Sequence, residues 1–325
     1  MEIDSVSSRG DADSTLGLET GSSTVSLRES DFKYVEENGR TYHSFNAGKY
    51  ALPNDEDEQE RLDLQHHLFL LTLNGLHIAP LPPSIHNVLD IGTGTGLWAI
   101  EFAQEYPMAH VIGSDLSPIQ PQYVPPNCAF EISDAEEPWT YRQKFDYIHG
   151  RDLVFCFRDP SQIIVEAYNA LSPGGILEMQ DPQMPITCVD NSMDWGPLAK
   201  WTAEVCCAAE RLGRPLTNSR HYGRWMQEAG FLDVAERHFY WSLNTWPWSR
   251  KQKLIGWLAQ QNLVVGVEAM SMALLTRGLK WSREEVEVLL AGVRHDLKNR
   301  AVHSYVDVVV FYGRKPGPTC DTSLG

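Results

Sequence analysis

The feature that most constrains the fold is a strand–turn–helix pattern at residues 87–105. A short apolar run ends at Asp90, a helical pattern begins at Leu97, and three glycines stand between them at alternate positions, Gly92, Gly94 and Gly96. Glycines allow positive φ angles and a close approach of the backbone to a ligand. The helix N-terminus then presents unpaired N–H groups. The pattern predicts a binding site for a small molecule with a polar or anionic end.

The glycine spacing separates two cofactors. The dinucleotide fingerprint is G-x-G-x-x-G, whereas the third glycine here comes one residue early. Asp90 stands two residues before the first glycine, where a carboxylate would repel a pyrophosphate but could accept from the ammonium group of an amino acid. The residues therefore favour S-adenosylmethionine over NAD.

Two further predicted strands end in acids. The strand at residues 111–115 ends at Asp115, roughly 20 residues past the glycines, where a ribose-binding carboxylate is expected. The strand that begins at Cys128 is followed by Asp134. Three acids at three successive strand ends are a stronger signal than a glycine turn with incidental acids.

These motifs resemble those of class I S-adenosylmethionine-dependent methyltransferases, in segments 90–96, 134–135 and 171–175 and at Asp115. More narrowly, over about residues 32–316 the chain resembles the fungal LaeA-like methyltransferases, relatives of trans-aconitate methyltransferase. The segments that carry this resemblance are 38–43, 50–56, 61–67 and 148–153. The resemblance implies an α/β fold with a Rossmann-like sheet, mostly parallel with an antiparallel last strand, an N-terminal helical cover and a helical lid insertion.

The resemblance also implies a set of cofactor-binding residues: Asp90, Gly92, Thr93, Gly94, Gly96, Asp115, Leu116, Asp134, Ala135, Arg151, Tyr50, Arg61 and His66. In the family, the acid at Asp134 meets the adenine amino group and the next backbone N–H meets a ring nitrogen. Arg61 and His66 would cover the cofactor from an N-terminal helix that Asn54 caps and that ends near Leu73. The alternative is that His66 binds a carbonyl and Arg61 pairs with an acid.

Composition excludes several classes of function. The chain has 43 Asp and Glu against 27 Lys and Arg, with no basic cluster, so nucleic acid is not expected as a partner. It has no apolar run of about 18 residues and no signal-peptide pattern, so no membrane span is expected. Its six cysteines show no C-x-x-C spacing, which indicates reduced thiols in a cytoplasmic or nuclear protein.

The expected organisation follows these patterns along the chain. We expect a disordered tail at 1–30, a helical cover at 31–83 and the cofactor-binding core at 84–185. Lid helices and the remaining strands of the same domain follow at 186–316, with a short tail at 317–325. Helices are predicted at 195–211 and 282–298, and a fifth strand at 176–181. The many tryptophans of the lid would suit an apolar or aromatic acceptor, although core packing explains any one of them.

Methyl transfer needs mainly an acceptor atom held in line with the methyl group. An alcohol acceptor would also need a base, for which His149, Tyr42 and His43 are the leading candidates. His149 could instead only orient its turn. No pattern of metal ligands occurs, so metal-independent transfer is expected.

Three functions remain open at this point. The first is an S-adenosylmethionine-dependent methyltransferase that acts on O or N of a small, aromatic or apolar secondary metabolite. The second is a LaeA-like regulator of secondary metabolism that acts through protein partners, in the nucleus. The third is a protein of this fold that binds the cofactor without transferring methyl.

Overall fold

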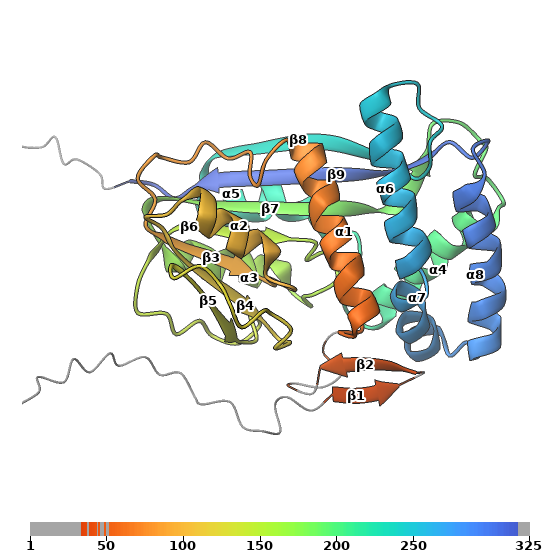
Figure 1. Cartoon of the computed structure of the whole chain (residues 1–325), viewed down its shortest axis with the longest axis horizontal. Helices are drawn as coiled ribbons and strands as arrows, with labels where there is room; N and C mark the ends of the chain where they lie inside the picture. Colours follow the sequence, from red (N-terminus) through yellow and green to blue (C-terminus); the bar gives the residue numbers. More distant parts are fainter. Residues whose placement is uncertain (1–33, 38, 44, 46–48, 50–51, 318–325) are drawn as a thin grey trace, which may run out of the picture.

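The computed structural model describes residues 34–37, 39–43, 45, 49 and 52–317. The predicted N-terminal tail, Tyr50 and residues 318–325 lie outside the described residues. The described chain forms one large sheet with helices on both faces, beside a small sheet of two strands, β1 (Tyr34–Glu37) and β2 (Arg40–His43) (Figure 1).

The large sheet has seven strands in the order β5-β4-β3-β6-β7-β9-β8. β3 to β7 pair in parallel, while β9 runs antiparallel to both of its neighbours. The predicted α/β sheet, mostly parallel with an antiparallel last strand, is therefore confirmed. The strand bounds are β3 Asn87–Ile91, β4 His110–Asp115, β5 Cys128–Ile132, β6 Phe145–Arg151, β7 Leu171–Cys188, β8 Leu232–Ser242 and β9 Ser304–Arg314.

The chain reverses its direction of travel across the sheet beside β3. β4 and β5 are added on one side of β3, and β6 then pairs with its other side. Ligands of open α/β sheets bind at such a switch point, outside the carboxyl ends of the strands. The topology therefore places a crevice next to the Gly-rich turn that follows β3.

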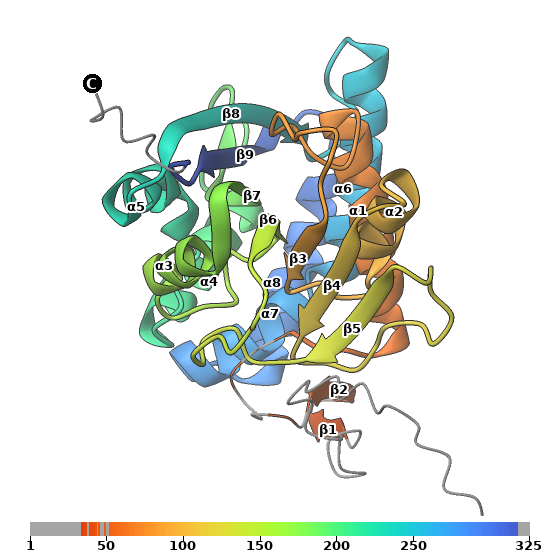
Figure 2. The same cartoon turned by 90° about the vertical axis from the view of Figure 1, so that its left-hand side faces the viewer.

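Helices cover both faces of the sheet. In Figure 2, α2 lies on one face and α3 and α5 lie on the other. The helix bounds are α1 Glu56–Leu73, α2 Leu97–Glu105, α3 Pro160–Ala170, α4 Pro197–Arg211, α5 Tyr222–Ala229, α6 Arg250–Gly266, α7 Ala269–Ala273 and α8 Arg283–Lys298, with shorter turns at Asn218–His221 and Leu274–Gly278.

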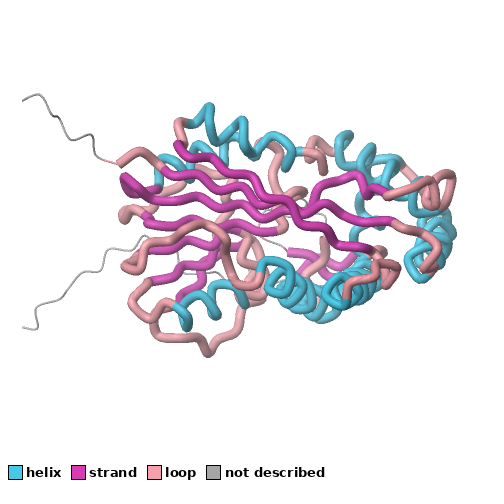
Figure 3. The backbone as a smooth tube through the Cα atoms, turned by 90° about the horizontal axis from the view of Figure 1, so that it is seen from above, coloured by secondary structure: helices cyan, strands magenta, loops and turns pink. Residues whose placement is uncertain are grey.

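The last strands of the sheet extend beyond the shorter ones into a helical half of the molecule (Figure 3). Helices α4 to α8 are inserted after β7 and β8, which matches the predicted lid insertion. Buried apolar side chains such as Trp201, Leu263 and Val306 fill this half. Among the described residues no single helix is long and apolar enough to cross a membrane, although α6 and the following helix, bent by 48°, meet that criterion together.

Three local predictions differ from the structure. Asp55, not Asn54, caps α1, and its side chain accepts from Glu58 N at 3.1 Å. Asn54 is instead bound to β2, because its N–H donates to Thr41 O at 2.8 Å. The helix expected from Trp195 begins at Pro197, since Trp195 has φ of +64°.

The third difference is the length of β7. The strand expected at 176–181 runs from Leu171 to Cys188. The boundary expected between residues 185 and 186 therefore lies inside this strand, and the core and lid regions share one sheet.

Arg61 joins α1 to the helical half of the molecule. Its guanidinium is buried, donates to Glu58 Oε1 at 2.8 Å and donates to Asn262 Oδ1 on α6 at 2.9 Å. A buried cation needs a charged partner and satisfied donors, and both lie within the protein here. Arg61 thus follows the alternative of pairing with an acid, and it does not line the predicted cofactor pocket.

Replacing Arg61 with Met should lower the free energy of unfolding by about 3–5 kcal/mol, because Glu58 would remain buried without its cation. Urea unfolding followed by circular dichroism measures this change. The double variant Glu58→Gln, Arg61→Met should regain a large part of the loss, since no uncompensated charge remains. A single variant as stable as wild type would show that the pair does not hold α1 in place.

Candidate functional site

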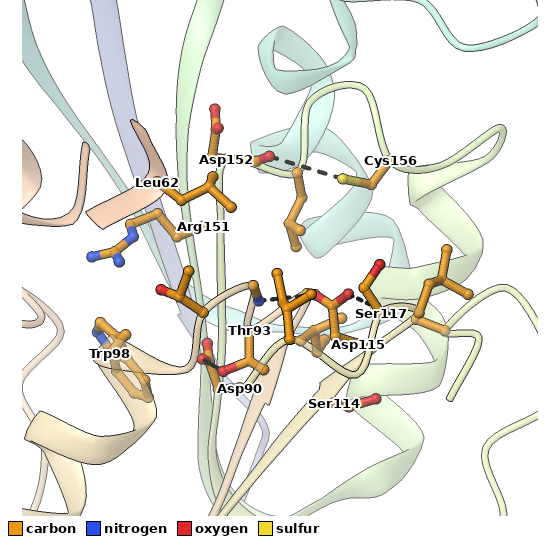
Figure 4. Close-up of a pocket in the computed structure, with 18 of the residues that line it drawn as sticks. Leu62, Asp90, Thr93, Trp98, Ser114, Asp115, Ser117, Arg151, Asp152 and Cys156 are labelled. Atoms are coloured by element: carbon orange, nitrogen blue, oxygen red, sulfur yellow. Dashed lines mark hydrogen bonds between the residues drawn. The ribbon is translucent and has the colours of Figure 1, made fainter. Parts of the chain in front are cut away.

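A pocket opens at the carboxyl ends of β3, β4 and β6, under the inner face of α1 (Figure 4). Acids from three strand ends meet there, as the sequence predicted. The predicted cofactor-binding residues that line it are Asp90, Gly92, Thr93, Gly94, Asp115, Leu116, Asp134, Ala135, Arg151 and His66. Of the three candidate catalytic residues, only His149 lines this pocket.

Four predicted site residues lie elsewhere. Gly96 caps α2, where its hydrogen faces the ring of Phe130, and Arg61 is held by Glu58. Tyr42 and His43 are buried on β2 and do not line the pocket. Sequence spacing could not exclude them, because a small separate sheet carries both. Tyr50 lies outside the described residues.

The Gly-rich turn brings the backbone close to the pocket. Gly92 and Gly94 have φ of +62° and +57°, a region that favours glycine. A Cβ at Gly92 would lie 2.5 Å from Leu153 Cδ2, whereas one at Gly94 would meet only Leu62 Cδ1 at 3.6 Å. Gly92 is therefore required for packing as well as for conformation, and Gly94 for its positive φ.

Asp90 and His149 form a buried pair across β3 and β6. Their backbones are register partners, and His149 Nδ1 lies 2.7 Å from Asp90 Oδ1. Thr93 Oγ1 donates to the other oxygen of Asp90 at 2.5 Å. The imidazole stacks on Trp98 with ring centroids 3.8 Å apart. A carboxylate can only accept, so His149 Nδ1 carries the proton and a neutral ring leaves Nε2 as an acceptor.

Arg151 and His66 form a second buried pair in the pocket. Arg151 Nη2 donates to His66 Nδ1 at 2.8 Å, and the guanidinium lies 4.9 Å from the ring centre of Phe69. Because arginine only donates, the proton of His66 is on Nε2, which is 3.1 Å from Glu101 Oε2. Burial lowers the pKa of Arg151 to about 10, so it remains a cation at neutral pH.

The two remaining acids differ in their partners. Asp115 accepts from Gly94 N at 2.8 Å and from Ser117 N at 2.9 Å, and burial raises its pKa to about 6. Asp134 pairs with Lys49 and accepts from Glu136 N at 3.0 Å. Both residues line the pocket.

A second cavity lies beside the first, within the helical half. Its volume is about 150 Å³, and its lining is apolar except for Gln65, Asp152 and Asn262. Trp201 and Trp241 line it, while their indole N–H groups donate away to Ser271 and Thr72. Gln65 and Asp152 line both cavities, so the two spaces adjoin at these residues.

Only some of the lid tryptophans line the apolar cavity. Trp201 and Trp241 line the apolar cavity, whereas Trp195 and Trp248 are fully exposed. The sequence analysis missed Gln65 and Asp152. Both lie in segments that carry the family resemblance, 61–67 and 148–153, but neither was singled out as a site residue.

Two groups of the pocket fit a cofactor that carries an amino acid. His149 Nε2 is buried and has no hydrogen-bond partner within the described residues. Arg151 is a buried cation that forms no ion pair with a carboxylate in the described part of the chain. An acceptor and a cation that both lack such partners fit an ammonium and a carboxylate group. Across the described ranges, no cluster of three or more His, Cys, Asp or Glu could hold a metal ion.

Comparison with known proteins gives consistent family relationships. A model described as a methyltransferase domain matches residues 57–236. Methyltransferase pytC of Aspergillus terreus is 38% identical over 302 residues, which are 92% of this chain and 93% of that protein. The secondary metabolism regulator laeA of Aspergillus niger is 35% identical over 314 residues, which are 93% of this chain and 81% of that protein.

Among solved structures, one similar chain is phosphoethanolamine N-methyltransferase 2 of Haemonchus contortus in complex with S-adenosyl-L-methionine. It is 18% identical, with a TM-score of 0.45, over 83% of this chain and 54% of that chain. This chain thus spans about half the length of that enzyme.

The pair formed by His66 and Arg151 can be tested by titration. Burial, followed by the charge of Arg151, lowers the pKa of His66 to about 3. The imidazole should therefore stay neutral from pH 8 to pH 5, with NMR signals that do not move. Arg151→Met should raise the pKa of His66, although not to 6.5 because burial remains, whereas Arg151→Lys should change it less. A wild-type His66 that titrates between pH 6 and pH 7 would contradict this arrangement.

Proposed function

We propose that this chain, which belongs to the methyltransferase-domain family, takes S-adenosylmethionine as its cofactor. It would methylate an O or N atom of a small apolar metabolite bound in the apolar cavity. The observation that carries this proposal is the contact between the two cavities. One is polar and lined by the strand-end acids, the other is apolar, and they adjoin at Gln65 and Asp152.

The polar pocket supplies a partner for each part of the cofactor. Arg151 would bind its carboxylate, and His149, held by Asp90, would accept from its ammonium group. Asp115 would bind the ribose hydroxyls, and Asp134 the adenine amino group. When bound, the cofactor supplies an electrophilic methyl group on a sulfonium.

The apolar cavity supports an aromatic or apolar acceptor. An apolar cavity of about 150 Å³ can hold a benzene-sized ring. The indole N–H groups of Trp201 and Trp241 are already satisfied, so these residues present mainly apolar surface to a ligand. Burial of the ligand's apolar surface would then supply most of its binding free energy.

Catalysis would come mainly from positioning. The acceptor must lie in line with the methyl group, and holding two reactants in this way can remove about 7–11 kcal/mol of the barrier. α1 contributes Gln65 to both cavities, so one helix would contact both the cofactor and the acceptor. No metal ion enters the proposal.

Regulation through protein partners remains the second candidate, because the regulator laeA of Aspergillus niger is similar over most of this chain. The apolar lining of the second cavity favours the small-molecule function, since it suits an apolar ligand.

Loss of transfer activity with retained cofactor binding is a third candidate. We place the metabolite in secondary metabolism, as the names of the relatives suggest, and the protein in the cytoplasm, where free cysteines such as Cys156 and Cys206 stay reduced.

Cofactor binding should depend on pH through Asp115. The pKa of this carboxyl is raised to about 6, so it is ionised above pH 6 and protonated below. A ribose hydroxyl donates to the ionised form, so the affinity for S-adenosylhomocysteine should fall by up to about tenfold per pH unit below pH 6. Calorimetry measures this affinity.

Asp115→Asn should weaken S-adenosylhomocysteine at pH 8 by about tenfold or more and remove the pH dependence, because a charged acceptor is lost. Asp233→Asn, at an exposed ion pair with Arg314, is the control and should leave affinity unchanged. An unchanged affinity in Asp115→Asn would refute the ribose assignment.

The acceptor cavity can be filled by mutation. Ala259 lines it from α6, whereas Val265 on the same helix is half-exposed and does not. Ala259→Phe should abolish calorimetric binding of 2-naphthol to the S-adenosylhomocysteine complex, while Val265→Phe should preserve it. Equal binding by both variants would show that the apolar cavity does not receive aromatic acceptors.

A further inference from the structure

Asp152 stands at the junction of the two cavities. It directly follows β6 and lines both spaces together with Gln65. Among the described residues that line the apolar cavity, Asp152 is the only charged one. In Figure 4, the carboxylate of Asp152 points away from Asp115. A charged group at this position adjoins the place where an acceptor and the cofactor would meet.

The backbone of Asp152 is held in an uncommon conformation. Its φ is +57°, which non-glycine residues adopt rarely and which is often found at functional sites. β7 fixes this conformation, because Asp152 N donates to Gln180 O at 2.9 Å and Leu153 N donates to Asp181 Oδ1 at 2.5 Å. Val154 N also donates to Asp181. The surrounding strand therefore sets the direction of the Asp152 side chain.

We propose that Asp152 is a catalytic residue that binds the O–H or N–H group of the acceptor and receives its proton during methyl transfer. This inference rests on the proposed function. The acceptor O–H bond breaks and its proton passes to the Asp152 carboxylate. The oxygen lone pair forms the bond to the methyl carbon as the carbon–sulfur bond breaks, and that electron pair remains on sulfur. Asp152 then releases the proton to water.

Other polar groups near the acceptor cavity are already engaged. Asn262 Oδ1 accepts from Arg61, and the indole N–H groups of Trp201 and Trp241 donate to hydroxyls. Gln65 donates to Asp152 and leaves room for a second donor to the same carboxylate. His149, the earlier candidate for a base, lines only the cofactor pocket and is bound to Asp90.

The surroundings of Asp152 make its carboxylate a stronger base than an exposed one. Burial raises the pKa of Asp152 above 3.8, and Glu58 on α1 adds to this, whereas Arg61, Gln65 and Arg151 oppose it. Two further titratable groups face the same loop. Burial and the charge of Asp152 together raise the pKa of Asp181 to about 7, and burial raises the pKa of Cys156. A carboxylate whose pKa is raised accepts a proton more readily than an exposed one, which suits a general base.

The test compares 2-naphthol with 2-methoxynaphthalene, which has no hydroxyl proton, as ligands of the S-adenosylhomocysteine complex. Asp152→Asn and Asp152→Gly are the variants, because Asn and Gly tolerate the positive φ. Wild type should prefer 2-naphthol by about tenfold or more, since a charged acceptor binds its hydroxyl. Asp152→Gly should lose this preference, and Asp152→Asn should keep only a small part of it.

A pH series then separates a titrating carboxylate from a structural role. In wild type the preference for 2-naphthol should fall as the pH drops toward 3.8, because Asp152 becomes protonated, whereas Asp152→Asn should show no such change. An unchanged pH profile in Asp152→Asn would assign the titration to Asp181 or another group and overturn the inference. Equal affinities of wild type for the two ligands would also overturn it.

The result distinguishes failure of this inference from failure of the proposed function. If Ala259→Phe blocks 2-naphthol but both Asp152 variants bind it like wild type, the acceptor cavity stands and the role of Asp152 falls. If wild type does not bind 2-naphthol, or if Ala259→Phe binds it like wild type, the acceptor cavity and the role of Asp152 fall together.

Discussion

The hydrogen bond between His149 Nδ1 and Asp90 Oδ1 crosses the sheet at the point where its strand order reverses, and the pocket is arranged around it. The parallel register of β3 and β6 makes the two residues direct partners. Trp98, on the first turn of α2, stacks on the imidazole, and its N–H donates to Leu76 O at 3.0 Å. The pair thereby holds the end of β3, the start of α2 and the segment after α1 in fixed positions relative to one another.

The length of the last strands explains why a second cavity exists beside the first. β3, β4 and β5 end at the cofactor pocket, whereas β7, β9 and β8 continue past it (Figure 3). An extended sheet must bury its faces against other elements, and the inserted helices do this here. Because α1 contributes Gln65 to both cavities and Arg61 to the contact with α6, one helix joins the cofactor and acceptor sides.

Sequence reasoning found the parts of this site that depend on local patterns. The Gly-rich turn and the acids at Asp90, Asp115 and Asp134 follow strands, and carboxyl ends of parallel strands meet at one edge of a sheet. It could not place Arg61, because its burial depends on how α1 packs against Asn262, some 200 positions later. The prediction of Tyr42 as a site residue was wrong for a similar reason, because no residue spacing in the sequence indicates the small sheet to which it belongs. Gln65 lies in a segment that carries the family resemblance, but only helix packing shows that it lines both cavities.

The segment after β6 shows how one strand end serves two different environments. Arg151 is the last residue of β6 and faces the polar pocket, where its cation has no carboxylate partner within the described residues. Asp152 follows with a positive φ, and its own side chain lies at the border of the apolar cavity. Neighbouring residues of opposite charge therefore line the polar pocket and the border of the apolar cavity. An ordinary extended residue at position 152 would continue the strand. The left-handed conformation of Asp152 instead ends β6 at the border between the two cavities.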